Sequence, residues 1–324
     1  MENLLVLMPG SEDDQKRIRQ IAGERCEITF FDPTWTRAEY EARLRAANIV
    51  LGDPEPADLP LLENIRLHQS TWAGIERYAV HGDCYRGAAL CYMRGAYGPV
   101  IAEYAAASIF ALCWRFSAYD AAQRSGVWRG ALPGKTLEGA SVLIVGAGDI
   151  GRSLAARLRP FVKTIVGVRR RTGEPMEEFD RIASMDELDR LLPEADVVAC
   201  CLPRNPSTER LFNAARFARM KADAVFVNVG RGITVVTDDL NAALEEGRLW
   251  GAALDVTDPE PLPPEHPLWK QERARITPHV AGNMFGPGSP TDRRIWDVCL
   301  KNLENYLAGQ PLENVVDFAE YRAR

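Results

Sequence analysis

A chain of 324 residues is long enough for about two domains, and a hydrophobic content of 46% is ordinary for a globular protein. The formal net charge of −6 argues against a nucleic-acid-binding surface, so no nucleic-acid partner is expected. The seven cysteines have no metal-ligand spacing and the first residues show no basic leader, which predicts reduced thiols, a cytoplasmic location and no metal site. The longest apolar stretch, residues 101–114, contains Glu103 and is too short to span a bilayer, so no membrane anchor is expected.

The first part of the chain alternates short apolar runs with helical patterns. We predict strands at residues 4–8, 26–31, 49–51 and 66–70, with helices at 12–22 and 37–46. This alternation is typical of a parallel sheet with helices on its faces. Gly98-Pro99 then interrupts the pattern, and an alanine-rich helix is expected over residues 100–123.

A second alternating series follows this helix. Strands are predicted at residues 141–145, 164–168, 197–202, 224–229, 251–255 and 275–277, with helices such as 149–159 and 237–246 between them, and a closing helix at 292–308. We therefore predict an α/β fold of two Rossmann-like, doubly wound parallel-sheet domains with a cleft between them. The expected domains are a discontinuous substrate domain (residues 1–98 and 286–324) and an NAD(P)-binding domain (residues 99–285).

A glycine-rich turn follows the apolar run at residues 141–145. Gly146, Gly148 and Gly151 fit G-x-G-x-x-G, with Asp149 and Ile150 opening the next helix. The first glycine would allow the tight turn, the second would let the backbone approach a pyrophosphate, and the third would permit close packing of helix on strand. A helix N-terminus also attracts phosphate. An ordinary glycine turn is the alternative, but the flanking strand and helix favour dinucleotide binding.

The end of the next predicted strand indicates which dinucleotide is bound. NAD-binding folds commonly place a carboxylate there, which binds the ribose 2′-hydroxyl. This chain instead reads Arg169-Arg170-Arg171, and guanidinium groups suit a 2′-phosphate. The alternative is a solvated basic loop. We predict that NADP(H) is preferred, with NAD(H) as the second option, and that Arg169 and Arg170 bind the cofactor.

Three candidate catalytic side chains follow in order: Arg231, Glu260 and His279. A guanidinium can bind a carboxylate and stabilise charge on a neighbouring carbonyl oxygen, and an imidazole can donate a proton. A buried carboxylate beside the imidazole, the role expected of Glu260, would favour its protonated form. These are the groups that hydride transfer to a 2-oxo acid requires. Each residue alone has a structural alternative, respectively a surface ion pair, a solvated loop and a structural histidine, so the hypothesis depends on the combination.

These motifs resemble the D-isomer-specific 2-hydroxyacid dehydrogenase family, and residues 254–263, 266–269 and 277–279 are most similar to its glyoxylate/hydroxypyruvate reductase branch. The resemblance extends from residues 69–74 to the last helix. It implies catalytic roles for the three side chains above and contact of Asp255 with the nicotinamide. It also implies that the backbone N–H groups of Trp72, Ala73 and Gly74 bind the substrate carboxylate. The resemblance further implies a homodimer built by the long helix and the arm around Trp128; for Trp128, filling the core is an equal alternative.

Further cofactor contacts are expected at the ends of predicted strands and in the loops after them, at Leu202, Pro203, Thr208, Val229, Gly230 and Gly282. For Thr208 a purely structural role is an equal alternative. The predicted function is NADPH-dependent reduction of a small 2-oxo acid, similar to glyoxylate or hydroxypyruvate, to a D-2-hydroxy acid, with His279 as general acid. The alternatives are an NAD(P)-binding regulatory protein on the same fold and a reductase of larger, aromatic 2-oxo acids. Formate oxidation is disfavoured because the family's formate enzymes carry Gln where this chain has Glu260.

Overall fold

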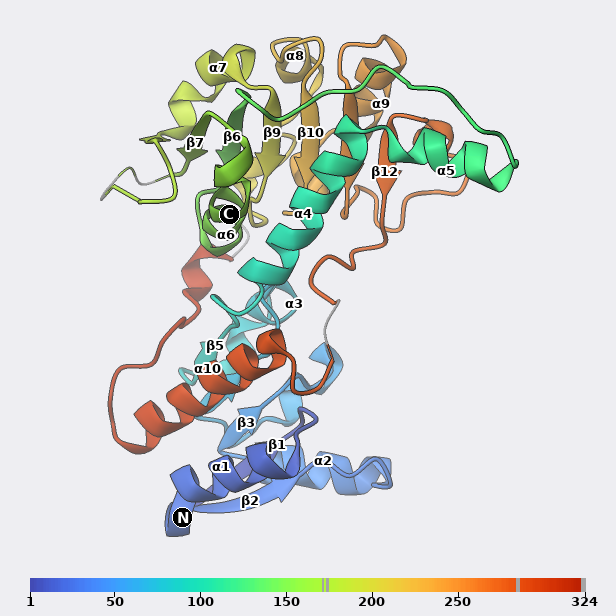
Figure 1. The fold of residues 1–324 in the computed structure, drawn as a ribbon. Coiled ribbons are helices and arrows are strands. Elements are labelled where there is room, and N and C mark those ends of the chain that lie inside the picture. Colours follow the sequence, from blue (N-terminus) through green and yellow to red (C-terminus); the bar gives the residue numbers. More distant parts are fainter. Residues whose placement is uncertain (171, 173–174, 284–285, 322–324) are drawn as a thin grey trace. The chain divides into compact units, whose positions relative to one another are not determined.

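The chain folds into two α/β units, shown as a ribbon in Figure 1. Unit 1 comprises Met1–Tyr97 and Phe285–Arg324, and unit 2 comprises Gly98–Met284. The computed structural model describes residues 1–170, 172, 175–283 and 286–321. Both units contain parallel sheets flanked by helices, which confirms the predicted fold class.

Unit 1 is built on a five-stranded parallel sheet in the order β2-β1-β3-β4-β5. Its strands are β1 (Glu2–Val6), β2 (Cys26–Phe30), β3 (Ile49–Leu51), β4 (Leu67–Gln69) and β5 (Ala89–Cys91). Alternate residues of β1 face opposite cores. Leu4 packs with α1 (Glu12–Ala22) and α10 (Pro290–Leu307), whereas Leu5 packs with α2 (Arg37–Ala46) and α3 (Glu76–Ala79). Helices therefore cover both faces of this sheet.

Unit 2 is built on a seven-stranded parallel sheet in the order β12-β11-β10-β9-β6-β7-β8. Its strands are β6 (Ser141–Val145), β7 (Thr164–Val168), β8 (Arg181–Ala183), β9 (Val197–Cys200), β10 (Val225–Asn228), β11 (Gly251–Leu254) and β12 (Ala274–Ile276). Val225 and Val227 belong to one buried cluster and Phe226 to the other, so the sheet has a core on each face.

The helices of unit 2 divide between the two faces of its sheet. α4 (Gly98–Cys113) and α6 (Asp149–Leu158) pack in one core, and α7 (Leu188–Leu191), α8 (Ala214–Phe217) and α9 (Thr237–Glu245) pack in the other. The single helix expected over residues 100–123 is wrong. Arg115 adopts a left-handed conformation (φ 55°), so the helix ends at Cys113 and α5 (Phe116–Arg124) leaves at a bend of 71°.

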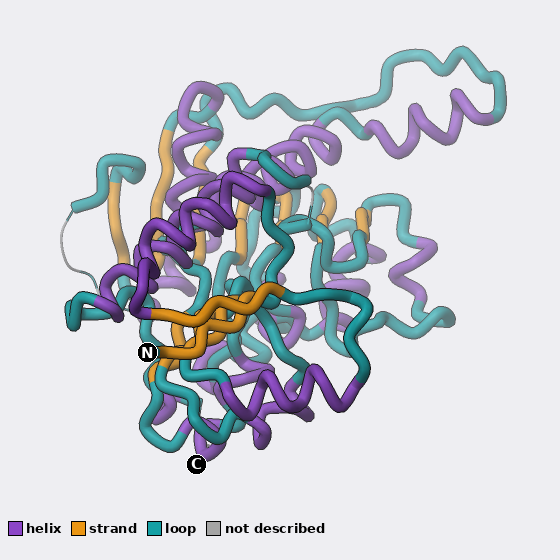
Figure 2. The backbone as a smooth tube through the Cα atoms, turned by 90° about the horizontal axis from the view of Figure 1, so that it is seen from below, coloured by secondary structure: helices purple, strands orange, loops and turns teal. Residues whose placement is uncertain are grey.

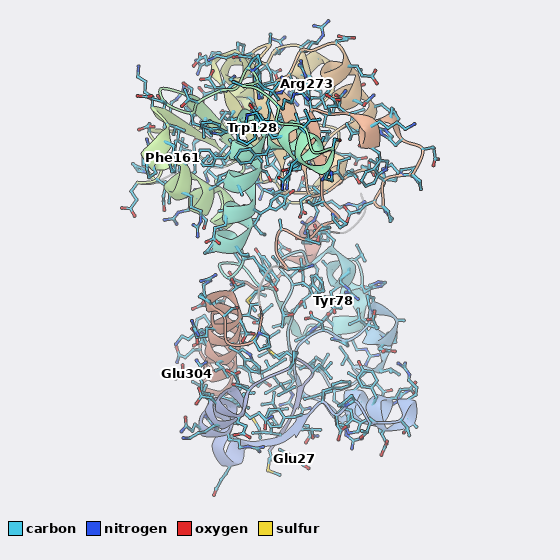
Figure 3. The ribbon with its side chains drawn as sticks, turned by 45° about the vertical axis from the view of Figure 1, so that its right-hand side comes forward. Glu27, Tyr78, Trp128, Phe161, Arg273 and Glu304 are labelled. Atoms are coloured by element: carbon cyan, nitrogen blue, oxygen red, sulfur yellow. The ribbon has the colours of Figure 1, made fainter. Side chains whose placement is uncertain are left out.

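Helix α5 and the loop after it extend away from the body of unit 2 (Figures 1 and 2). Trp128 lies in this loop with its side chain fully exposed (100%), so the interpretation that it fills the core is wrong (Figure 3). Within the described residues, no single helix is both long and apolar enough to cross a membrane. The bent pair α4–α5 satisfies that test only when its two helices are taken together, by length and composition alone.

Candidate active site

The glycine turn after β6 has the backbone geometry that its motif predicts. Gly146 has φ +110°, and its N–H group and that of Ala147 donate to Val168 O at 2.8 and 3.1 Å. A Cβ at Gly151 would lie 2.2 Å from Gly146 O, so only glycine lets α6 approach the strand this closely. A Cβ at Gly148, in contrast, would have no described atom within 4 Å. The second glycine thus borders open space, where the motif places a pyrophosphate.

The N-terminus of α6 remains available to an anion. Its N-cap is Gly148, which supplies no side-chain hydrogen bond to the first turn. The Asp149 carboxylate accepts a hydrogen bond from Gly98 N (3.0 Å), so it is held by the start of α4. Ile150 is half-buried. Uncapped N–H groups at a helix N-terminus attract phosphate, and these residues therefore fit a dinucleotide.

The predicted arginines lie beside this turn. Arg169 and Arg170 follow β7 directly, and the carbonyl of the preceding Val168 accepts the two N–H groups of the glycine turn. Arg169 is half-buried and its Nη1 lies 3.5 Å from Met176 Sδ, while Arg170 is exposed. Arg171 lies outside the described residues. No carboxylate occurs at the end of β7 where an NAD-binding fold commonly has one.

The loop after β9 passes close to two glycine turns. A Cβ at Gly146 would lie 2.7 Å from Cys201 O, and a Cβ at Gly230 would lie 2.4 Å from Leu202 O. Leu202 is buried and Pro203 is exposed. The Thr208 hydroxyl shares its one proton between the carbonyls of Pro203 (3.1 Å) and Asn205 (2.9 Å), and the side chain is buried. These contacts favour the structural role for Thr208 over cofactor binding.

Arg231 lies in a turn that follows β10 and is held by Asn228. The Asn228 side chain accepts from Gly230 N (3.0 Å) and donates to Arg231 O (3.1 Å), while Val229 is buried. The Arg231 side chain is half-buried, and its Nη1 donates to Gly230 O at 2.9 Å. A Cβ at Gly232 would lie only 1.8 Å from Thr257 O, so the turn presses against the loop that leads to Glu260.

His279 and Glu260 are in direct contact. The distance from His279 Nδ1 to Glu260 Oε1 is 2.7 Å, which makes this an ion pair when the imidazole is protonated. The expectation of a buried carboxylate is wrong, because the Glu260 side chain is 43% exposed and that of His279 is 50% exposed. Solvent therefore screens the attraction between the two charges. The contact occupies the Nδ1 atom of His279 and leaves its Nε2 atom for a substrate.

Asp255 organises the loop that carries His279. Its carboxylate is buried and accepts hydrogen bonds from the Thr277 hydroxyl (2.7 Å), Val280 N (2.9 Å) and Ala281 N (2.9 Å). Its backbone carbonyl accepts from His279 N at 2.8 Å. Gly282, at the end of this loop, is half-buried. The residue expected to contact the nicotinamide thus also fixes the backbone around the candidate acid.

The strand order brings these groups to one edge of the sheet. β10, β11 and β12 are adjacent and parallel, and Arg231, Asp255 and His279 follow their respective carboxyl ends. In open parallel sheets this edge is where ligands bind. Among the described residues of both units, no group of three or more His, Cys, Asp or Glu side chains could hold a metal ion.

The loop expected to bind a carboxylate lies in unit 1, after β4. Asp53 accepts from the Ser70 hydroxyl (2.6 Å) and from Thr71 N, and the Ser70 oxygen accepts from Trp72 N at 3.1 Å. The Trp72 N–H group thus already has an acceptor within the loop. Within the described part of the chain, the N–H groups of Ala73 and Gly74 have no acceptor, so these two remain candidates.

The chain is similar in sequence to known proteins. Residues 106–281, more than half of the chain, match the D-isomer specific 2-hydroxyacid dehydrogenase, NAD binding domain. An uncharacterized protein of the proB 3′ region of Corynebacterium melassecola is 38% identical over 271 residues, which cover 82% of this chain and 85% of that protein. The human glyoxylate reductase/hydroxypyruvate reductase is 34% identical over 257 residues (76% of this chain and 74% of the human protein).

A solved structure shows the same fold over almost the whole chain. It is a D-isomer specific 2-hydroxyacid dehydrogenase family protein from Aeromonas salmonicida subsp. salmonicida, with a TM-score of 0.81 and 31% identity over 98% of this chain and 99% of that one. The sequence match, the two parallel sheets and the glycine turn after β6 all agree with this family. The chain belongs to the D-isomer-specific 2-hydroxyacid dehydrogenase family and is an NAD(P)-dependent oxidoreductase.

Proposed function

We propose that this enzyme uses NADPH to reduce a small 2-oxo acid, similar to glyoxylate or hydroxypyruvate, to the D-2-hydroxy acid. The observation that carries the proposal is the 2.7 Å contact between His279 Nδ1 and Glu260, since it prepares one imidazole nitrogen for proton transfer. The similarity to the human glyoxylate reductase/hydroxypyruvate reductase supports the substrate class.

Each proposed step is assigned to a group of this chain. A bound reduced nicotinamide would supply the hydride. Arg231 binds the substrate carboxylate and stabilises the negative charge that develops on the carbonyl oxygen. In unit 1, the backbone N–H groups of Ala73 and Gly74 are the proposed donors to a carboxylate. His279 gives its Nε2 proton to the carbonyl oxygen, while Glu260 holds the ring through Nδ1.

The proposed preference for NADPH rests on Arg169 and Arg170. Both follow the strand end whose carbonyl, that of Val168, anchors the glycine turn, so they are near any dinucleotide bound there. A guanidinium is permanently charged and offers forked donors to a phosphate. We propose that these two residues bind the 2′-phosphate.

We also propose that the enzyme is a cytoplasmic homodimer. The extended arm around α5 carries Trp128, which is fully exposed in the single chain, and a second copy would remove this indole from water (Figure 3). All seven cysteines are free thiols, which fits a reducing compartment.

A panel of 2-oxo acids from glyoxylate to phenylpyruvate, assayed with NADPH and NADH, tests the proposal. We expect the highest kcat/KM for the small acids with NADPH, and His279→Ala should lower kcat by roughly 100-fold or more, as loss of a general acid does. A preference for phenylpyruvate would favour the reductase of aromatic substrates. Absence of turnover with every acid, together with normal NADPH binding, would favour a regulatory role.

A further inference from the structure

The backbone of His279 is held in a conformation that few residues adopt. Its φ is +54°, in the left-handed region, which for a residue other than glycine costs about 1 kcal/mol or more. The surrounding hydrogen bonds maintain this conformation: His279 N donates to Asp255 O at 2.8 Å, and the next two N–H groups donate to the Asp255 carboxylate. The direction of the imidazole thus depends on where that carboxylate lies.

The carboxylate is itself positioned by two hydroxyl groups in series. Thr277 Oγ1 donates its proton to Asp255 Oδ1 at 2.7 Å. Tyr104 Oη lies 2.5 Å from the same Thr277 oxygen. A hydroxyl group has one proton, so the proton in the second bond must come from Tyr104. The bonds therefore run in one direction, from Tyr104 through Thr277 to Asp255.

Tyr104 is well placed to act as a fixed donor. It lies in α4, a helix that packs against α6 and against β10 and β11, and its ring is half-buried. Burial raises the pKa of the phenol, so the proton stays on Tyr104 at neutral pH. The charged groups that act on this phenol are Asp255 and Arg275.

We propose that Tyr104 is a positioning residue for His279, acting through Thr277 and Asp255 without touching the substrate. The inference rests on the proposed role of His279 as general acid. Tyr104 in α4 thereby sets the direction of the His279 imidazole, although 173 positions separate Tyr104 from Thr277 in the sequence.

The kinetic test uses Tyr104→Phe, which keeps the buried ring and removes the hydroxyl. We expect kcat for glyoxylate reduction with NADPH to fall about fivefold, the usual effect of one lost hydrogen bond, with little change in KM for NADPH. Thr277→Val removes two bonds and should lower kcat about 25-fold, and Thr277→Ser should restore it. Because the bonds are in series, adding Tyr104→Phe to Thr277→Val should have no further effect.

The matched control is Tyr119→Phe. It removes another half-buried hydroxyl of unit 2, which accepts from Leu132 N at 2.8 Å, and it lies outside the series. We expect its kcat to equal that of the unchanged protein. Additive losses in the double variant, or an unchanged kcat in Tyr104→Phe, would overturn the proposal.

A second measurement does not depend on turnover. The chain has four histidines, so their imidazole resonances can be assigned by NMR, with His279→Gln identifying one of them. Tyr104→Phe should shift or broaden the His279 signal and leave those of His68, His81 and His266 in place. An unchanged His279 signal would contradict the proposal. If the unmodified protein reduced no 2-oxo acid while the His279 signal still responded to Tyr104→Phe, the proposed function would fail and the positioning role would stand.

Discussion

Replacing Glu260 by Gln measures what the carboxylate contributes beyond holding the ring. The amide oxygen can still accept a hydrogen bond from His279 Nδ1, so the change removes the charge and keeps the contact. Two unit charges about 4 Å apart attract by about 1 kcal/mol in water and about 4 kcal/mol at an effective dielectric constant of 20. Since the two side chains are 43% and 50% exposed, the value nearer to water applies.

An energy of about 1 kcal/mol corresponds to a fall in kcat of about fivefold. Steady-state assays with glyoxylate and NADPH at neutral pH would measure it. Glu260→Ala, which also removes the hydrogen bond, should lose about fivefold more. Glu265→Gln, a change of another exposed glutamate in the same loop, is the control and should have no effect. A loss of more than 100-fold for Glu260→Gln, or no loss, would refute the view that this carboxylate acts as a screened partner of the imidazole.

Three further variants test the cofactor and substrate sites. Arg169→Asp should raise KM for NADPH by roughly 10-fold or more, because it removes a charge-assisted bond to phosphate. Equal changes in the KM values for NADPH and NADH would contradict the 2′-phosphate assignment. Gly151→Ala forces a Cβ to 2.2 Å from Gly146 O and should lower the melting temperature by several degrees. Gly148→Ala, whose Cβ meets no described atom within 4 Å, should leave the melting temperature unchanged and weaken NADPH binding. A larger fall in melting temperature for Gly148→Ala than for Gly151→Ala would contradict this geometry. Asp53→Asn should raise KM for the 2-oxo acid a few-fold through the loop it anchors and leave KM for NADPH unaltered, and an equal rise in both constants would indicate general disruption.

Much of the fold was predictable because local signals agree with the tertiary structure. The predicted bounds of α1 and α2 are confirmed, and each helix begins with a capping box, Ser11 with Asp14 and Thr36 with Glu39. The break between α4 and α5 was not predictable, because Arg115 is an unusual residue for a left-handed position and the surrounding composition favours helix. The short edge strand β8 was missed because its three residues show no strand pattern.

The sequence allowed us to predict which residues follow the adjacent strands, but not the solvent exposure or the hydrogen-bond partners of their side chains. Motifs that follow adjacent parallel strands meet at one sheet edge, so the sequence indicated that Arg231 and His279 lie on that edge. It could not reveal the exposure of Glu260, which depends on side-chain packing. Nor could it identify Tyr104, an ordinary aromatic residue in an alanine-rich helix whose relation to Thr277 exists only in three dimensions.

The contact between Gly232 and Thr257 affects the backbone segments that carry Arg231 and Glu260. There is no room for even one carbon atom between the two backbones. The turn that carries Arg231 and the segment leading to Glu260 are therefore in direct contact through backbone atoms, and this contact does not involve their side chains. The separation of these two backbone segments is therefore set by main-chain contact and does not depend on the rotamers of Arg231 and Glu260.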